Sequence, residues 1–136
     1  MGAQRSCNGR KDLLKIGSKL LVVVADDEPA IVDLVRLILE DSGYEVLGAV
    51  GGLAAVTALQ SNPDAFVLDV LMPDLDGVNC VEQIRAAGFN GPILVMTTLR
   101  STVLRDDLAT RLDAQMIDKI KELGQILQLL GLRWGR

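Results

Sequence analysis

A run of six apolar residues, Leu20 to Ala25, stops abruptly at two adjacent aspartates, Asp26 and Asp27. The run is rich in valine and does not alternate with polar residues, which predicts a strand that is buried on both faces. Such a strand belongs in a parallel sheet that is covered by helices on its two sides. This one segment therefore favours an α/β fold.

The same alternation of apolar runs and amphipathic stretches continues along the chain. We expect strands at 20–25, 44–50, 65–68, 92–96 and 115–118, and helices at 29–43, 53–61, 78–87, 102–112 and 120–130. Five strands alternating with five helices imply parallel strands joined by right-handed crossovers. On the first helix, the periodicity predicts a buried stripe of Ile31, Leu34, Val35 and Ile38.

Length and composition exclude several classes of protein. The 136 residues, 49% hydrophobic and 24% charged, suit one globular domain, and the net charge of −4 argues against a direct nucleic-acid partner. With no histidine and two cysteines, a zinc site or a disulfide framework is not expected. The sequence contains neither an apolar run of about 18 residues nor a signal-peptide core, so we expect a cytoplasmic protein without a membrane contact.

Polar residues stand at the ends of the predicted strands. They are Asp26 and Asp27 after the first strand, Asp69 after the third, Thr97 after the fourth and Lys119 after the fifth. Ligands of open parallel sheets bind beyond the carboxyl ends of the strands, so these side chains are expected to converge. Clustered carboxylates suit Mg²⁺, while a lysine and a hydroxyl suit phosphoryl oxygens. The pattern indicates a phosphoryl-transfer site with an aspartate nucleophile.

Four segments in this order resemble the receiver domains of bacterial response regulators. They are residues 21–29, 67–77 and 93–97, and Lys119. Intervals of 42, 28 and 22 residues separate Asp27, Asp69, Thr97 and Lys119, and they also fit that family. The resemblance implies a flavodoxin-like, doubly wound sheet of five parallel strands in the order 2-1-3-4-5, with five helices.

The resemblance also implies where the domain lies and which residues hold its metal ion. We expect a receiver domain at 19–131, between a flexible N-terminal extension at 1–18 and a short tail at 132–136. Asp69 would be the phosphoacceptor, with Mg²⁺ as the cofactor. Four residues would form the protein's share of the metal site: Asp27 directly, Asp26 mainly through water, Asp69, and Leu71 through its backbone carbonyl.

Signalling by such a domain depends on contacts with other proteins. The resemblance implies that a sensor histidine kinase or a phosphotransfer protein supplies the phosphoryl group, and that a downstream protein effector responds to it; it implies no enzyme beyond autocatalytic phosphorylation and dephosphorylation. Lys119 would pair with the phosphoryl oxygens, and Thr97 would carry the switch to a surface formed by residues 102–112, 115–118 and 120–130. Receiver domains commonly form homodimers through this surface.

The sequence departs from the family pattern near that switch. Met116 stands where an aromatic residue is usual, Thr98 where a small residue is usual, and Ile120 where proline is usual. We expect Met116 to take the aromatic's place in the switch, Thr98 to slow exchange with small phosphoryl donors, and Ile120 to follow a trans peptide bond. Leu71 and Leu99 place apolar groups where a hydrolytic water would be oriented, which predicts a long-lived phosphoryl group.

Two other functions compete with an active receiver. The departures at Met116, Thr98 and Ile120 would also suit a degenerate receiver that acts only as a protein-docking module. The sequence at 74–77, Asp-Leu-Asp-Gly, is superficially similar to the D-x-D-G motif of haloacid-dehalogenase-type phosphatases, but it lies in a loop in the middle of the chain. We interpret Asp74 and Asp76 as solvated turn formers.

Overall fold

The computed structural model describes residues 19–97 and 102–118. The predicted extension at 1–18, the fifth helix at 120–130 and the tail at 132–136 lie outside these ranges. Within them, no helix has both the length and the apolar character needed to span a bilayer.

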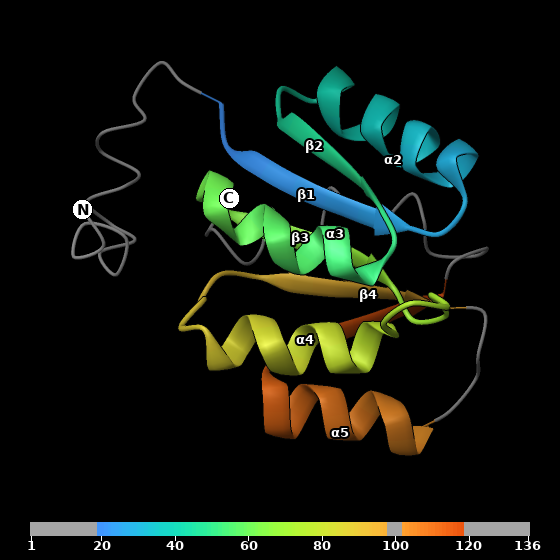
Figure 1. The fold of residues 1–136 in the computed structure, drawn as a ribbon, viewed down its shortest axis with the longest axis vertical. Helices are drawn as coiled ribbons and strands as arrows, with labels where there is room; N and C mark the ends of the chain where they lie inside the picture. The colour runs from blue at the N-terminus through green and yellow to red at the C-terminus, as the bar shows by residue number, and fades with distance from the viewer. Residues whose placement is uncertain (1–18, 98–101, 119–136) are drawn as a thin grey trace.

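The described residues form one parallel sheet with helices on both faces (Figure 1). Its strands are β1 (Leu21–Asp26), β2 (Glu45–Val50), β3 (Ala65–Asp69), β4 (Ile93–Thr97) and β5 (Gln115–Asp118). All strand pairs are parallel and the order across the sheet is β2-β1-β3-β4-β5. The prediction of a five-stranded, doubly wound sheet in the order 2-1-3-4-5 is therefore confirmed.

In the described ranges, four helices and a short 3₁₀ helix connect the strands. They are α2 (Pro29–Asp41), α3 (Gly52–Thr57), η2 (Ala58–Ser61), α4 (Gly77–Ala86) and α5 (Thr102–Leu112). The helix predicted at 53–61 begins one residue earlier and continues beyond residue 57 as η2, ending at Asn62 in the left-handed conformation. This tightening of the last turn is common at helix ends, and sequence periodicity does not reveal it.

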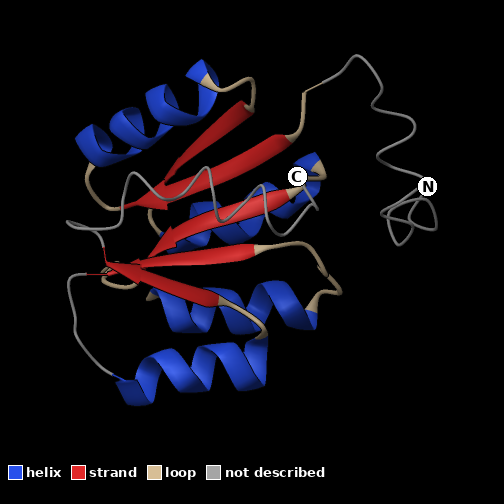
Figure 2. Cartoon of the chain, turned by 180° about the vertical axis from the view of Figure 1, so that it is seen from behind, coloured by secondary structure: helices blue, strands red, loops and turns tan. Residues whose placement is uncertain are grey.

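Two apolar cores lie on opposite faces of the sheet. Helices α3, α4 and α5 cover one face, where Phe66, Leu68 and Val95 are buried. Helix α2 covers part of the other face, where Val24, Val67 and other aliphatic side chains are buried. Figure 2, seen from this second face, shows the strand arrowheads gathered at one edge. Groups at the strand ends are thus brought together.

Helix α2 begins and ends as expected but turns a different stripe toward the sheet. Pro29 occupies its first turn, and the chain leaves it through Gly43 at a φ of 95°, with the Tyr44 amide bonded to the carbonyl of Leu39. The predicted stripe was wrong at Leu34, which is 43% exposed. The buried residues are Val32, Val35 and Leu39. Apolar residues occupy adjacent positions along this helix, so two overlapping stripes were available and packing on β1 and β2 selects one of them.

Candidate functional site

Three carboxylates meet at the carboxyl edge of the sheet, as the sequence predicts. Asp26 ends β1, Asp27 follows it directly, and Asp69 ends the neighbouring strand β3. One carboxylate oxygen from each residue lies within 4.8 Å of the other two. Asp26 and Asp69 are buried, at 0% and 4% exposure, whereas Asp27 is exposed. The cluster therefore has a buried floor and one side that is open to solvent.

Backbone hydrogen bonds fix Asp26 at the end of β1. Its Oδ1 accepts the amide of Glu28 at 3.0 Å, which stabilises the sharp turn that leads into α2. Its carbonyl oxygen accepts the amide of Gly51 at 3.1 Å, which joins the end of β1 to the turn after β2. These two contacts tie Asp26 to the backbone of the turns after β1 and β2.

The remaining strand ends lie on β4 and β5. Thr97 ends β4 with 2% exposure, one residue beyond Met96, which pairs with Asp69 across the sheet. Met116 lies on β5 within the core beneath α3, α4 and α5, and its carbonyl oxygen accepts a 3.2 Å hydrogen bond from Arg105 of α5. Met116 is thus a core residue, and its role in the switch stays a prediction.

Several predicted site residues lie outside the described ranges. They are Thr98, Leu99, Lys119 and Ile120. The described part of the chain ends at Asp118, one residue before Lys119. Asp118 pairs with Thr97 across β4 and β5. Leu71, whose backbone carbonyl is predicted to bind the metal ion, is described and is 54% exposed.

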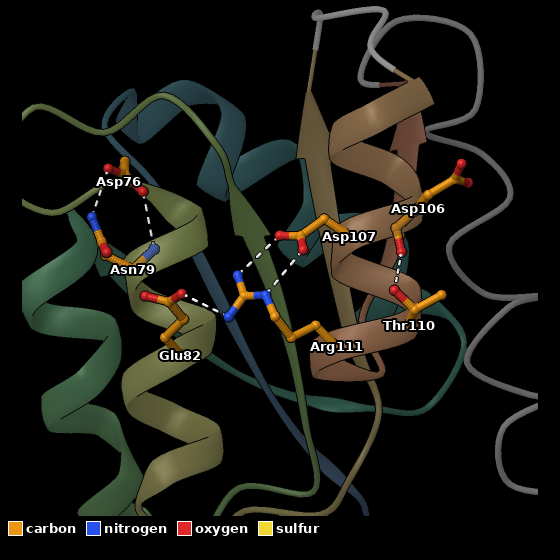
Figure 3. A network of polar contacts seen from close by, with 7 residues as sticks. All are labelled: Asp76, Asn79, Glu82, Asp106, Asp107, Thr110 and Arg111. Carbon is orange, nitrogen blue, oxygen red and sulfur yellow. Dashed lines mark hydrogen bonds and ion pairs between the residues drawn. The ribbon is translucent and has the colours of Figure 1, made fainter.

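The loop between β3 and α4 contains two aspartates whose contacts the sequence did not reveal. Asp76 is the N-cap of α4: its Oδ1 accepts the Asn79 amide at 3.0 Å and its Oδ2 accepts the Asn79 side-chain amide at 2.9 Å (Figure 3). Asp74 accepts backbone amides from the turn after β2, at Gly52 and Leu53. Neither is simply a solvated turn former. An acidic residue three positions before Asn79 was a usable signal for the cap, whereas nothing local indicated the partners of Asp74.

The chemistry of the donor set suits a hard divalent cation. Two unit charges 4.8 Å apart repel by roughly 3 kcal/mol at an effective dielectric constant of about 20. Three carboxylates held this close, two of them buried, are stabilised by a cation among them. Oxygen ligands on an open edge of this kind match the preference of Mg²⁺, which keeps several waters and binds phosphate oxygens. The residues present therefore fit a magnesium ion.

Comparison with known proteins agrees with this geometry. The family model described as "Response regulator receiver domain" matches residues 22–130, most of the chain. The chain belongs to the response regulator receiver domain family. Membership places it among signalling domains rather than among enzymes that turn over a substrate.

Individual receiver proteins show the same likeness. The response regulator MprA of Mycobacterium sp. (strain KMS) is 37% identical over 113 residues, which cover 80% of this chain and 46% of MprA. The chain thus spans about half the length of this curated relative. The response regulator TrrA of Thermotoga maritima, solved with Mg²⁺ and beryllium fluoride, is 29% identical, with a TM-score of 0.68 over 82% of this chain and 98% of that one.

A further solved structure supports the fold. The CheX–CheY–BeF₃–Mg²⁺ complex of Borrelia burgdorferi matches with a TM-score of 0.78 and 24% identity, covering 86% of this chain and 90% of that one. At this identity the match supports the fold alone.

Proposed function

We propose that this receiver domain accepts a phosphoryl group on Asp69, with the help of Mg²⁺, from a sensor histidine kinase or a phosphotransfer protein. The observation that carries the proposal is the cluster of Asp26, Asp27 and Asp69, with ligand oxygens within 4.8 Å of one another at the ends of β1 and β3. A carboxylate at such a position can act as a nucleophile toward phosphorus.

The proposed roles follow from the position of each group. The donor is a phosphohistidine of the partner protein. A carboxylate oxygen of Asp69 forms a bond to phosphorus while the bond from phosphorus to the histidine nitrogen breaks. The electron pair of the broken bond leaves with the imidazole. Asp26, Asp27 and Asp69, with the carbonyl of Leu71, would hold the metal ion. When bound, Mg²⁺ neutralises the charge of the carboxylates and of the phosphoryl oxygens.

Two further residues are assigned from the sequence pattern. Lys119 would pair with a phosphoryl oxygen by charge, and the hydroxyl of Thr97 would donate a hydrogen bond to another. Because Thr97 ends β4 beside β5, a movement of its side chain is well placed to alter the surface formed by α5 and β5. We propose that a downstream protein effector recognises this surface, with Met116 repacking in place of the usual aromatic residue.

Beryllium fluoride is used here in place of a phosphoryl group, so the test needs no knowledge of the kinase. It accompanies Mg²⁺ in the TrrA structure. We would titrate the full chain with MgCl₂, add beryllium fluoride, and follow backbone amide signals by NMR. The signals of Asp69, Val70 and Thr97 are expected to shift with beryllium fluoride only when Mg²⁺ is present. The shift should be absent in Asp69→Asn.

The matched control is Asp64→Asn. Asp64 is also buried and also adjoins β3, but it lies at the opposite end of that strand, where it accepts the Leu21 amide at 2.7 Å. This variant should respond to beryllium fluoride like the wild type. If the wild-type chain binds neither Mg²⁺ nor beryllium fluoride, the proposal is wrong, and a docking module without phosphoryl chemistry becomes the better account.

A further inference from the structure

Asp74, in the loop between β3 and α4, holds the turn that follows β2. Its Oδ1 accepts the amide of Gly52 at 2.9 Å and the amide of Leu75 at 2.9 Å, and its Oδ2 accepts the amide of Leu53 at 3.1 Å. These bonds, first of all the one from Gly52, lower the pKa of the Asp74 carboxyl group below its ordinary value. The carboxylate thus joins its own loop to a turn that lies earlier in the chain, 22 residues away at Gly52 and 21 residues away at Leu53.

The turn and the loop approach each other too closely for side chains at two glycines. A Cβ on Gly52 would collide with the carbonyl oxygen of Leu75, and a Cβ on Gly51 would lie 2.8 Å from Oδ2 of Asp74. Gly51 also has a φ of 101°, a conformation that other residues rarely adopt. In addition, the buried thiol of Cys80 donates to the carbonyl oxygen of Gly52 at 3.3 Å. The turn is therefore fixed against the loop at several points.

The same turn is also bonded to the backbone of Asp26, one of the three clustered aspartates. The amide of Gly51 donates to the carbonyl oxygen of Asp26, while the next two amides donate to Asp74. The loop that contains Asp74 begins directly after Asp69 and includes Leu71. Two backbone hydrogen bonds hold the ends of this loop. The Val70 amide donates to the carbonyl oxygen of Met96, and the Gly77 amide donates to the carbonyl oxygen of Val70. Asp74 therefore connects the middle of the loop to the turn after β2, and the same turn is bonded to the end of β1 through Gly51.

We propose that Asp74 is a positioning residue for the metal site: it sets the distance between the Leu71 carbonyl and the carboxylates at the end of β1. This inference rests on the proposed function, because it assigns Leu71 and Asp26 to one magnesium site. Residues that orient metal ligands without touching the ion commonly change metal affinity by tenfold or more. Asp74 acts through the backbone, and its effect should appear in Mg²⁺ affinity rather than in the chemical step.

The test compares Asp74→Asn and Asp74→Ala with the wild-type chain and with Asp64→Asn. The control alters the same kind of contact at the far end of the sheet, where a carboxylate accepts a backbone amide from a distant segment. Mg²⁺ affinity is measured by calorimetry, and the phosphorylation rate with acetyl phosphate is measured across a range of Mg²⁺ concentrations. We expect both Asp74 variants to bind Mg²⁺ about tenfold more weakly. Their rates at saturating Mg²⁺ should stay within about twofold of the wild type.

The outcomes separate this inference from the function on which it rests. Unchanged Mg²⁺ affinity in Asp74→Asn, with a wild-type chain that is phosphorylated normally, overturns the role of Asp74 and leaves the proposed function intact. An equal loss of affinity in Asp64→Asn also overturns it, since the effect would then be general destabilisation. If the wild-type chain neither binds Mg²⁺ nor gains a phosphoryl group, both proposals fail together. Should Asp74→Ala not fold, Asp74→Asn decides, because its side-chain oxygen can still accept one of the amides.

Discussion

The Nε of Arg85 donates a 2.8 Å hydrogen bond to the carbonyl oxygen of Leu112, and this contact joins the end of α4 to the end of α5. The same guanidinium donates to the carbonyl oxygens of Phe89, Gly91 and Asp113. Its central carbon also lies 5.7 Å from the centre of the Phe89 ring. One side chain of α4 thus satisfies carbonyl groups at the end of α5 and in the loop before β4.

Replacing Arg85 is expected to lower the stability of the fold without touching the carboxylate cluster. Arg85→Ala removes charged hydrogen bonds to four carbonyl groups, which should reduce the free energy of unfolding by about 3 kcal/mol. Arg85→Lys keeps the charge but not the planar fork, so it should recover less than half of that loss. Urea unfolding followed by circular dichroism measures both values. An Arg85→Ala variant as stable as the wild type would contradict this role.

The exposed ion pairs of Arg111 predict a small, pH-dependent effect. Arg111 contacts Asp107 at 2.9 Å within α5 and Glu82 of α4 at 3.0 Å (Figure 3). The hydrogen bonds from Arg111 hold the pKa of Asp107 below its ordinary value of 3.8. This contribution to stability is therefore present above pH 3.8 and is lost as the pH falls through the lower pKa of the folded state.

Arg111→Ala should consequently differ most from the wild type near neutral pH. The difference in free energy of unfolding between the two proteins should narrow as the pH falls below 3.8. It should also shrink in about 0.5 M salt, because the pairs are exposed and screened. Urea titrations at several pH values check this. If the difference in free energy of unfolding grows as the pH falls, the predicted direction of the pH dependence is wrong.

Burial makes the thiol of Cys80 unreactive in the folded protein. Burial first, and then the charges of Asp74 and Asp76, raise the pKa of Cys80 from 9.0 to about 12. Thiolate is the reactive form, so in a Cys7→Ser background we expect Ellman's reagent to label the unfolded chain rapidly at pH 8 and the folded chain at less than about 1% of that rate. Stability should fall as the pH rises from 9.0 toward 12, since only the unfolded thiol ionises in that window. Rapid labelling of the native protein would contradict this burial.

Gly77 is needed for space where the loop after Asp69 returns to α4. A Cβ at this position would collide with the carbonyl oxygen of Asp69 and lie 2.8 Å from the Cα of Val70. Gly77→Ala should therefore cost about 2 kcal/mol of stability and lower phosphorylation of Asp69. Gly88 is the matched control: it has a φ of 98° but open space around it, so Gly88→Ala should cost about 1 kcal/mol and leave phosphorylation unchanged. Equal effects in the two variants on both readouts would contradict the steric argument.

The sheet and its carboxylate cluster could be predicted because local sequence encodes both. Apolar runs mark strands, and parallel strands carry their carboxyl ends to one edge. Asp26, Asp27 and Asp69 were therefore brought together by topology alone. Boundaries shifted by a residue or two, as at β1, which includes Asp26 although the apolar run ends at Ala25.

Contacts between distant segments could not be predicted in this way. The bonds from Asp74 to Gly52 and Leu53 depend on how two turns pack, and the residue type is equally suited to a solvated turn. The exposure of Leu34 has a similar cause, because a helix with apolar residues at adjacent positions can turn either stripe inward. Tertiary packing, rather than local preference, decides such cases.

The central claim is that Asp69 accepts a phosphoryl group when Mg²⁺ is present. Its most direct test is the intact mass of the full chain after incubation with acetyl phosphate, with and without Mg²⁺, beside Asp69→Asn and Asp64→Asn. We predict a gain of one phosphoryl group in the wild type and in Asp64→Asn, dependent on Mg²⁺ and absent from Asp69→Asn. No gain in the wild type, despite measurable Mg²⁺ binding and an excess of donor, or an equal gain in Asp69→Asn, would contradict the claim.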